Sequence, residues 1–97
     1  MNYELGFHPD ALNEWRRLDA TVRAMFKKKL LERLQNPRVP AARLAGKPDR
    51  FKIKLRASGY RLVYEVRDAQ LIVVVVAVGK RERNAAYMAA ARRSATP

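Results

Sequence analysis

Basic and apolar side chains alternate along one short segment, so Lys52, Lys54 and Arg56 would share one face of a strand. A glycine-containing turn then brings Arg61 onto the neighbouring strand of a hairpin. Seven basic residues and one acidic residue lie between Arg43 and Arg61. Like charges on adjacent positions repel and cost stability unless an anion binds there. The row therefore predicts an anion-binding face, with a solvated surface charge as the alternative interpretation of any single residue.

Cleavage of RNA by its own 2′-hydroxyl is a reaction that such a row could catalyse. The reaction needs a base for the hydroxyl, cations beside the five-coordinate phosphorane and a proton for the leaving 5′-oxygen. A lysine among other cations loses its proton more easily. Lys52 and Lys54, about 6.5–7 Å apart on one strand face and opposite Arg61, meet that condition. Such chemistry is slow unless the substrate is positioned, which predicts that a second macromolecule holds the RNA.

A second basic group, Lys80, Arg81 and Arg83, lies just before Tyr87. One interpretation of this group is a solubilising end to a very hydrophobic strand. The other is that it converges with the first row on one concave site. Tyr87 also has two interpretations that spacing leaves open, because it could anchor a short helix in the core or stack on an unpaired base.

Several other kinds of site are excluded by composition. The sequence has no cysteine and one histidine, His8, so it predicts no disulfide, no metal site and no cofactor. The hydroxyl residues have no histidine partner for a hydrolase triad, and the four glycines are scattered rather than gathered in a phosphate-binding loop. The net charge of +12 on 97 residues predicts an anionic partner for one small domain.

The elements that must position these residues follow from hydrophobic periodicity. Alternation predicts strands, and a spacing of three or four predicts helices. Pro9 and Asp19 mark helix starts, and Pro37 ends the second helix. The predicted strands are 2–7, 51–56, 60–66 and 71–78, and the predicted helices are 9–18, 20–35 and 82–93.

This order predicts an α+β domain over residues 1–97, β-α-α-β-β-β-α, with two N-terminal helices packed on one face of a small, mostly antiparallel four-stranded sheet. The other sheet face is expected to be free. The last helix has a thin apolar stripe, so we expect it to dock weakly and residues 94–97 to fray. The longest apolar run has eight residues, where a membrane-spanning helix needs about 20, and no signal peptide is evident. We therefore expect a cytoplasmic protein without membrane contact.

Four blocks of sequence occur in order at compatible spacing. They are Leu12–Leu18, Lys27–Leu30, Phe51–Tyr64 and Val78–Arg83, with Tyr87 beyond the last. Together they resemble the RelE family, the ribosome-dependent messenger-RNA interferase toxins of bacterial toxin–antitoxin pairs. The resemblance covers about residues 1–90.

The resemblance implies metal-independent cleavage of messenger RNA in the ribosomal A site, which gives a 2′,3′-cyclic phosphate. It implies that Lys54 is the general base and that Lys52 and Arg61 stabilise the phosphorane. Arg81 would serve the leaving group, and Tyr87 would stack on the nucleotide.

Contacts to the rest of the substrate are expected from the remaining basic residues of both groups. Where the RelE family has Leu-Arg-Gly, this chain reads Leu44-Ala45-Gly46, so one phosphate contact is missing, and the nearby lysine is a candidate replacement. The predicted substrate-binding residues are Lys47, Arg56, Lys80 and Arg83.

The resemblance also implies a RelB-like antitoxin, and binding of promoter DNA only as the toxin–antitoxin complex. Two alternatives remain. One is a toxin of the same fold, similar to ParE, that inhibits DNA gyrase and cleaves no RNA. The other is a non-catalytic basic RNA-binding module.

Overall fold

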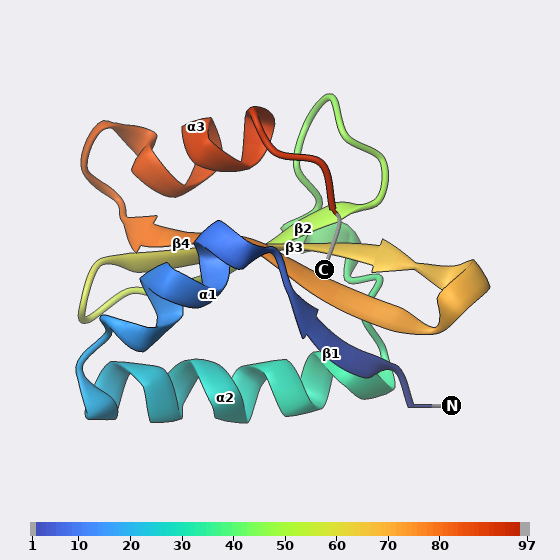
Figure 1. The fold of residues 1–97 in the computed structure, drawn as a ribbon, viewed down its shortest axis with the longest axis horizontal. Coiled ribbons are helices and arrows are strands. Elements are labelled where there is room, and N and C mark those ends of the chain that lie inside the picture. The colour runs from blue at the N-terminus through green and yellow to red at the C-terminus, as the bar shows by residue number, and fades with distance from the viewer. Residues whose placement is uncertain (1, 96–97) are drawn as a thin grey trace.

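A four-stranded sheet forms the middle layer of the protein in the computed structural model, which describes residues 2–95 (Figure 1). Its strands are β1 (Glu4–Phe7), β2 (Arg50–Leu55), β3 (Tyr60–Arg67) and β4 (Ile72–Lys80). The spatial order is β1-β4-β3-β2. β1 runs parallel to β4, whereas β4 with β3 and β3 with β2 pair antiparallel. The predicted fold class is therefore confirmed.

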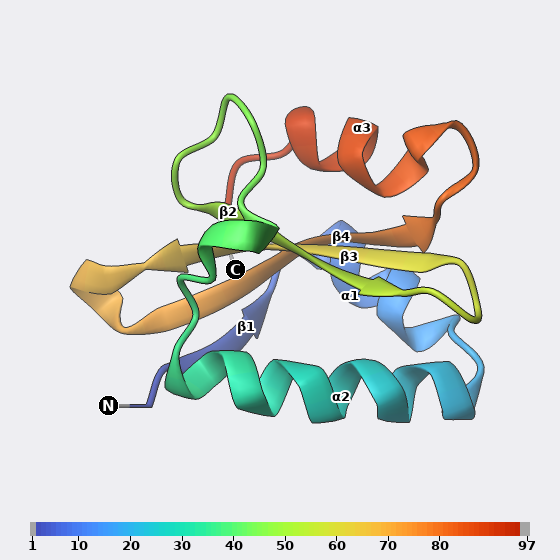
Figure 2. The same ribbon diagram turned by 180° about the vertical axis from the view of Figure 1, so that it is seen from behind.

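Helices α1 (Pro9–Arg16) and α2 (Ala20–Gln35) cover one face of this sheet (Figure 2). The Asp19 carboxylate accepts a hydrogen bond from the Thr21 backbone N–H and caps α2, as its position predicts. Phe26 and Leu30 of α2 are fully buried in the core. α1 ends two residues earlier than predicted, because residues 17 and 18 form the turn that leads to α2.

A third helix, α3 (Ala85–Ala91), covers the opposite face of the sheet (Figures 1 and 2). The prediction that this face is free is wrong. Alanines 86, 89 and 90 of α3 are buried in one cluster with Val63 and Val74 of the sheet. Small side chains allow a close approach, and a Cβ built on Gly79 of β4 would lie 3.5 Å from the Ala86 backbone nitrogen. A strand that is apolar on both faces requires this second cover.

α3 begins later than predicted for a backbone reason. Arg83 and Asn84 have φ values of 56° and 53°, in the left-handed region that interrupts a right-handed helix. A short 3₁₀ turn therefore occupies Glu82–Asn84, and the α-helix starts at Ala85.

The chain beyond α3 returns to the sheet. Ala95 is only 3% exposed, and its carbonyl accepts a hydrogen bond of 2.5 Å from Arg67. Residues 96 and 97 of the predicted frayed tail lie outside the described residues. Within residues 2–95, no helix is both long enough and apolar enough to span a membrane.

Candidate active site

The basic row of β2 lies on the face of the sheet that α3 partly covers. Phe51, Ile53 and Leu55 are buried against α1 and α2, so the alternating residues point to the other face. Lys54 pairs directly with Arg61 of β3. Side chains opposite each other on adjacent antiparallel strands lie about 4.5–5.5 Å apart at Cβ. The structure thus brings the predicted lysine and arginine together at the exposed edge of the sheet.

Neighbouring positive charge lowers the pKa of the Lys54 amine below its usual value. The largest cause is the charge of Lys52, followed by desolvation and then by the charges of Arg61 and Arg56. Each of these disfavours the ammonium form. A lowered pKa increases the fraction of neutral amine at neutral pH, which suits a residue that must accept a proton.

Arg81 lies at the same end of the sheet, beside the hairpin turn. Its backbone N–H donates a 2.8 Å hydrogen bond to the Gly59 carbonyl. Its side chain runs past Gly59, where a Cβ would lie 3.7 Å from the Arg81 Nε atom. Gly59 has a φ of 76°, so glycine is favoured there for its backbone as well. Because Arg61 pairs with Gly79 just before Arg81, the two arginines flank the same turn.

Tyr87 projects from α3 above the sheet and is half-buried, which falls between its two predicted roles. Tyr87 packs against the small apolar cluster beneath α3. Tyr87 also lines a cavity of about 130 Å³ between α3 and the loop that precedes β2. Ala45, Lys47 and Arg50 line the same cavity, so Lys47 is brought close to Tyr87 from the loop.

A wider groove of about 320 Å³ runs along the outer edge of β2. Lys52, Lys54 and Arg56 line it together with Arg33 of α2. Arg33 donates hydrogen bonds to the Lys52 carbonyl (3.2 Å) and to the Tyr64 hydroxyl (2.8 Å). Arg33 is not among the site residues predicted from the sequence, because its place on a helix is also typical of a solubilising charge. No local pattern in the sequence indicates that the end of α2 contacts β2.

Lys80 and Arg83 belong to the end of β4 and the turn that follows it. Lys80 pairs with Tyr60, and its ammonium lies 5.9 Å from the centroid of that ring. Tyr60 packs against the core under α1 and α2, so Lys80 points to the opposite face from Lys54. Arg83 is exposed on the turn between β4 and α3.

Arg50 corrects one sequence interpretation. It is one of the seven basic residues from Arg43 to Arg61 on which the predicted anion-binding face rests, yet it is 2% exposed. Its guanidinium donates to the Glu65 carboxylate and to the carbonyls of Ala90 and Arg93. These partners occupy the guanidinium, so Arg50 supports α3 rather than offering a charge to a ligand.

Comparisons with known proteins agree with this architecture. Residues 5–85 match the family described as the ParE toxin of the type II toxin–antitoxin system parDE. The chain is 55% identical over 93 residues to the mRNA interferase toxin RelE of Escherichia coli K12, covering 96% of this chain and 98% of the relative. It is equally similar to the mRNA interferase RelE of Shigella flexneri, with the same coverage.

Solved structures of similar proteins have the same fold. A mutant of E. coli RelE in the free state superposes with a TM-score of 0.89 at 53% identity, covering 96% of this chain and 98% of that one. RelE in the intact E. coli RelBE toxin–antitoxin complex superposes with a TM-score of 0.80 at 57% identity, covering 84% and 99%. The resemblance inferred from sequence is confirmed, and the chain belongs to the RelE/ParE family of type II toxin–antitoxin toxins.

Proposed function

We propose that the protein is an mRNA interferase, a toxin that cleaves messenger RNA in the ribosomal A site and so stops translation. The observation that carries the proposal is the cross-strand pair of Lys54 and Arg61, with Lys52 beside it and Arg81 at the same sheet end. This cationic site lies in a chain 55% identical to proteins named mRNA interferase.

The proposed reaction is an in-line attack by the ribose 2′-hydroxyl on the adjacent phosphorus. Lys54 in its neutral form takes the hydroxyl proton, and Lys52 and Arg61 stabilise the negative charge of the phosphorane. The bond to the 5′-oxygen then breaks, and Arg81 stabilises or protonates that leaving oxygen. The products are a 2′,3′-cyclic phosphate and a 5′-hydroxyl.

Substrate positioning is assigned to residues around this centre. Tyr87 stacks on a nucleotide beside the cavity that it shares with Lys47. Arg56 lies in the groove along β2 and contacts the RNA backbone. Arg83 on its exposed turn, and Lys80 on the far side of the strand end, would meet phosphates farther away.

The proposed partners are a ribosome that holds the mRNA and a RelB-like antitoxin. The basic row of β2 lies along a strand edge, so a second macromolecule must align the 2′-hydroxyl with the phosphate. RelE of E. coli has been solved in complex with RelB. We propose that an equivalent antitoxin inactivates this toxin in the cytoplasm and that the complex, rather than the free toxin, binds promoter DNA.

Incubation with ribosomes carrying a defined mRNA tests the proposal. We expect cleavage within the A-site codon, a 2′,3′-cyclic phosphate end, and no cleavage of the same RNA without ribosomes. Inhibition of DNA gyrase without RNA cleavage would instead support the ParE-like alternative. Binding to ribosomes without cleavage would support the RNA-binding module.

The pH dependence of cleavage gives a sharper test of Lys54. A general base acts when deprotonated, so the rate should rise with pH up to the pKa of Lys54. Lys52→Gln removes the largest cause that lowers this pKa, which therefore rises. We expect the ascending limb of the single-turnover pH profile to move to higher pH.

Two measurements control this prediction. Arg56→Gln removes the smallest of the four causes and should move the limb less than Lys52→Gln does. NMR titration of the Lys54 side chain in the free protein should show the same order of pKa values. A limb that stays in place in Lys52→Gln would mean that another group titrates.

A further inference from the structure

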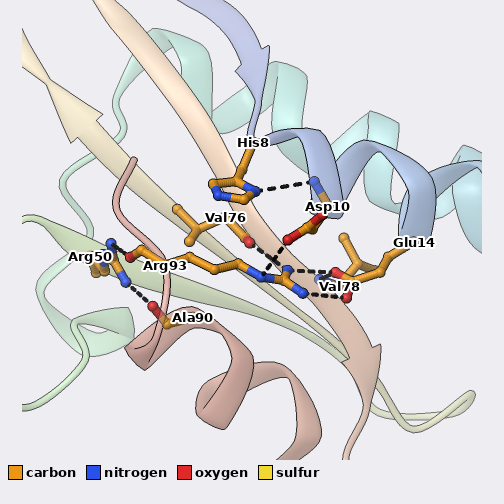
Figure 3. A network of polar contacts seen from close by, with 8 residues as sticks. All are labelled: His8, Asp10, Glu14, Arg50, Val76, Val78, Ala90 and Arg93. Carbon is orange, nitrogen blue, oxygen red and sulfur yellow. Dashed lines mark hydrogen bonds and ion pairs between the residues drawn. The ribbon is translucent and has the colours of Figure 1, made fainter. Parts of the chain in front are cut away.

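An arginine just after α3 ties the C-terminal segment to the first helix (Figure 3). The two terminal nitrogens of Arg93 each lie 2.9 Å from a Glu14 carboxylate oxygen, which makes a bidentate pair. Arg93 also donates to the Val76 carbonyl of β4 at 2.9 Å. The two side chains are 16% and 29% exposed, so the pair is largely shielded from water. Paired parallel hydrogen bonds fix geometry more strictly than a single charge contact.

Glu14 is itself held in place by the sheet. Its carboxylate accepts a 3.0 Å hydrogen bond from the Val78 backbone N–H (Figure 3). The parallel ladder between β1 and β4 extends only from Ile72 to Val75 along β4. Glu14 thus supplies an acceptor to β4 beyond the end of that ladder, and it meets Arg93 from a fixed position.

Arg50 holds the same end of α3 from the other side. It donates to the carbonyls of Ala90 and Arg93, which close the last turn of the helix and the segment after it. α3 has only seven residues, and those that touch the sheet are mainly alanines. Burial of so little apolar surface gives a weak hold, so the polar contacts determine where the helix lies.

Tyr87 lies on this short helix, about one turn before Ala90, whose carbonyl accepts a hydrogen bond from Arg50. A shift of α3 moves the ring relative to the lysine row of β2. Displacement of a substrate-orienting group by about 1 Å is enough to cost on the order of 100-fold in rate.

From this geometry we propose that Glu14 and Arg93 are positioning residues, which act through α3 to place Tyr87 for stacking on the RNA. The inference rests on the proposed function for the role of Tyr87, but the position of the ring belongs to the free protein. Arg50 of β2 helps to hold α3 in the same position, and the contacts of Glu14, Arg93 and Arg50 together are called the clamp below.

The first test measures the free protein by amide hydrogen exchange and by the NMR signals of the Tyr87 ring. In Arg93→Ala we expect exchange of the α3 amides to rise by roughly tenfold or more, with unchanged protection of β3 and β4. The Tyr87 ring signals should shift. Arg92→Ala is the matched control, because Arg92 is adjacent and exposed, and it should leave both readouts unchanged. Unchanged α3 protection in Arg93→Ala would overturn the clamp.

The second test is a double-mutant cycle on ribosome-dependent cleavage. Arg93→Ala should slow single-turnover cleavage on the order of tenfold in the parent and less than about twofold in a Tyr87→Ala background. Glu14→Gln keeps an acceptor for Val78 but loses the ion pair, and it should fall between parent and Arg93→Ala. Equal losses in both backgrounds would overturn the assignment to Tyr87. If the parent does not cleave at all, the proposed function fails, whereas the exchange data still decide the clamp.

Discussion

Lys54→Ala is expected to slow single-turnover cleavage of ribosome-bound mRNA by about 10²–10⁴-fold, the range typical for loss of a positioned general base. The variant should fold normally. Lys54 is exposed at the sheet edge, and its removal opens no cavity and relieves repulsion from Lys52 and Arg61. Cleavage rates at saturating ribosome concentration and a thermal unfolding curve check both halves of the prediction.

Arginine substitutions separate the base from its electrostatic neighbours. Lys54→Arg keeps the positive charge but provides no neutral amine near pH 7, so it should be as impaired as Lys54→Ala. Lys52→Arg preserves the charge beside the phosphorane and should retain most activity. Lys28→Ala, an exposed lysine on α2, serves as the control for loss of one charge. Substantial cleavage by Lys54→Arg would contradict a base at this position and assign the residue to charge stabilisation.

The face of the site was predictable from the sequence because strand periodicity is a local property. Alternation of Phe51, Ile53 and Leu55 with basic residues determines which side chains are buried wherever the strand pairs. The turn at Gly59 then places Arg61 opposite Lys54. Both facts depend on fewer than a dozen neighbouring residues, as does the start of α2 at its cap.

The support of the site was not predictable because it depends on contacts between distant segments. Arg50 is basic and falls on the same alternation as Lys52 and Lys54 of its strand, yet the helix that returns over the sheet buries it. Glu14 and Arg93 meet from opposite ends of the chain, and neither has a local pattern that indicates its partner. The face of the sheet to which Lys80 points depends on the pairing of β4 with β3, which places Lys80 opposite Tyr60. The thin apolar stripe of the last helix also led to the prediction of a loosely docked helix. α3 nevertheless approaches the sheet closely, since its alanines and Gly79 allow contact without large side chains.

Arg50→Met is expected to cost about 3 kcal/mol of unfolding free energy, toward the lower end for a broken buried ion pair because Glu65 keeps some access to water. Methionine retains much of the volume but provides no donor. The carbonyls of Ala90 and Arg93 lose the hydrogen bonds that Arg50 gives them, and Glu65 loses its nearest cation. For a domain of this size the change corresponds to a fall in Tm of roughly 12–24 °C. Urea unfolding followed by far-ultraviolet circular dichroism measures it.

The cause of that loss can be separated from a general effect of removing charge. Arg56→Met, at an exposed position six residues along the same segment, should change stability by less than about 0.5 kcal/mol. Adding Glu65→Leu to Arg50→Met removes the carboxylate that has lost its nearest cation and should recover part of the loss, while the two carbonyls remain without these donors. A loss below about 1 kcal/mol in Arg50→Met would show that water replaces the guanidinium at the end of α3. Arg93 and Glu14 would then be left as the contacts that keep Tyr87 over the sheet.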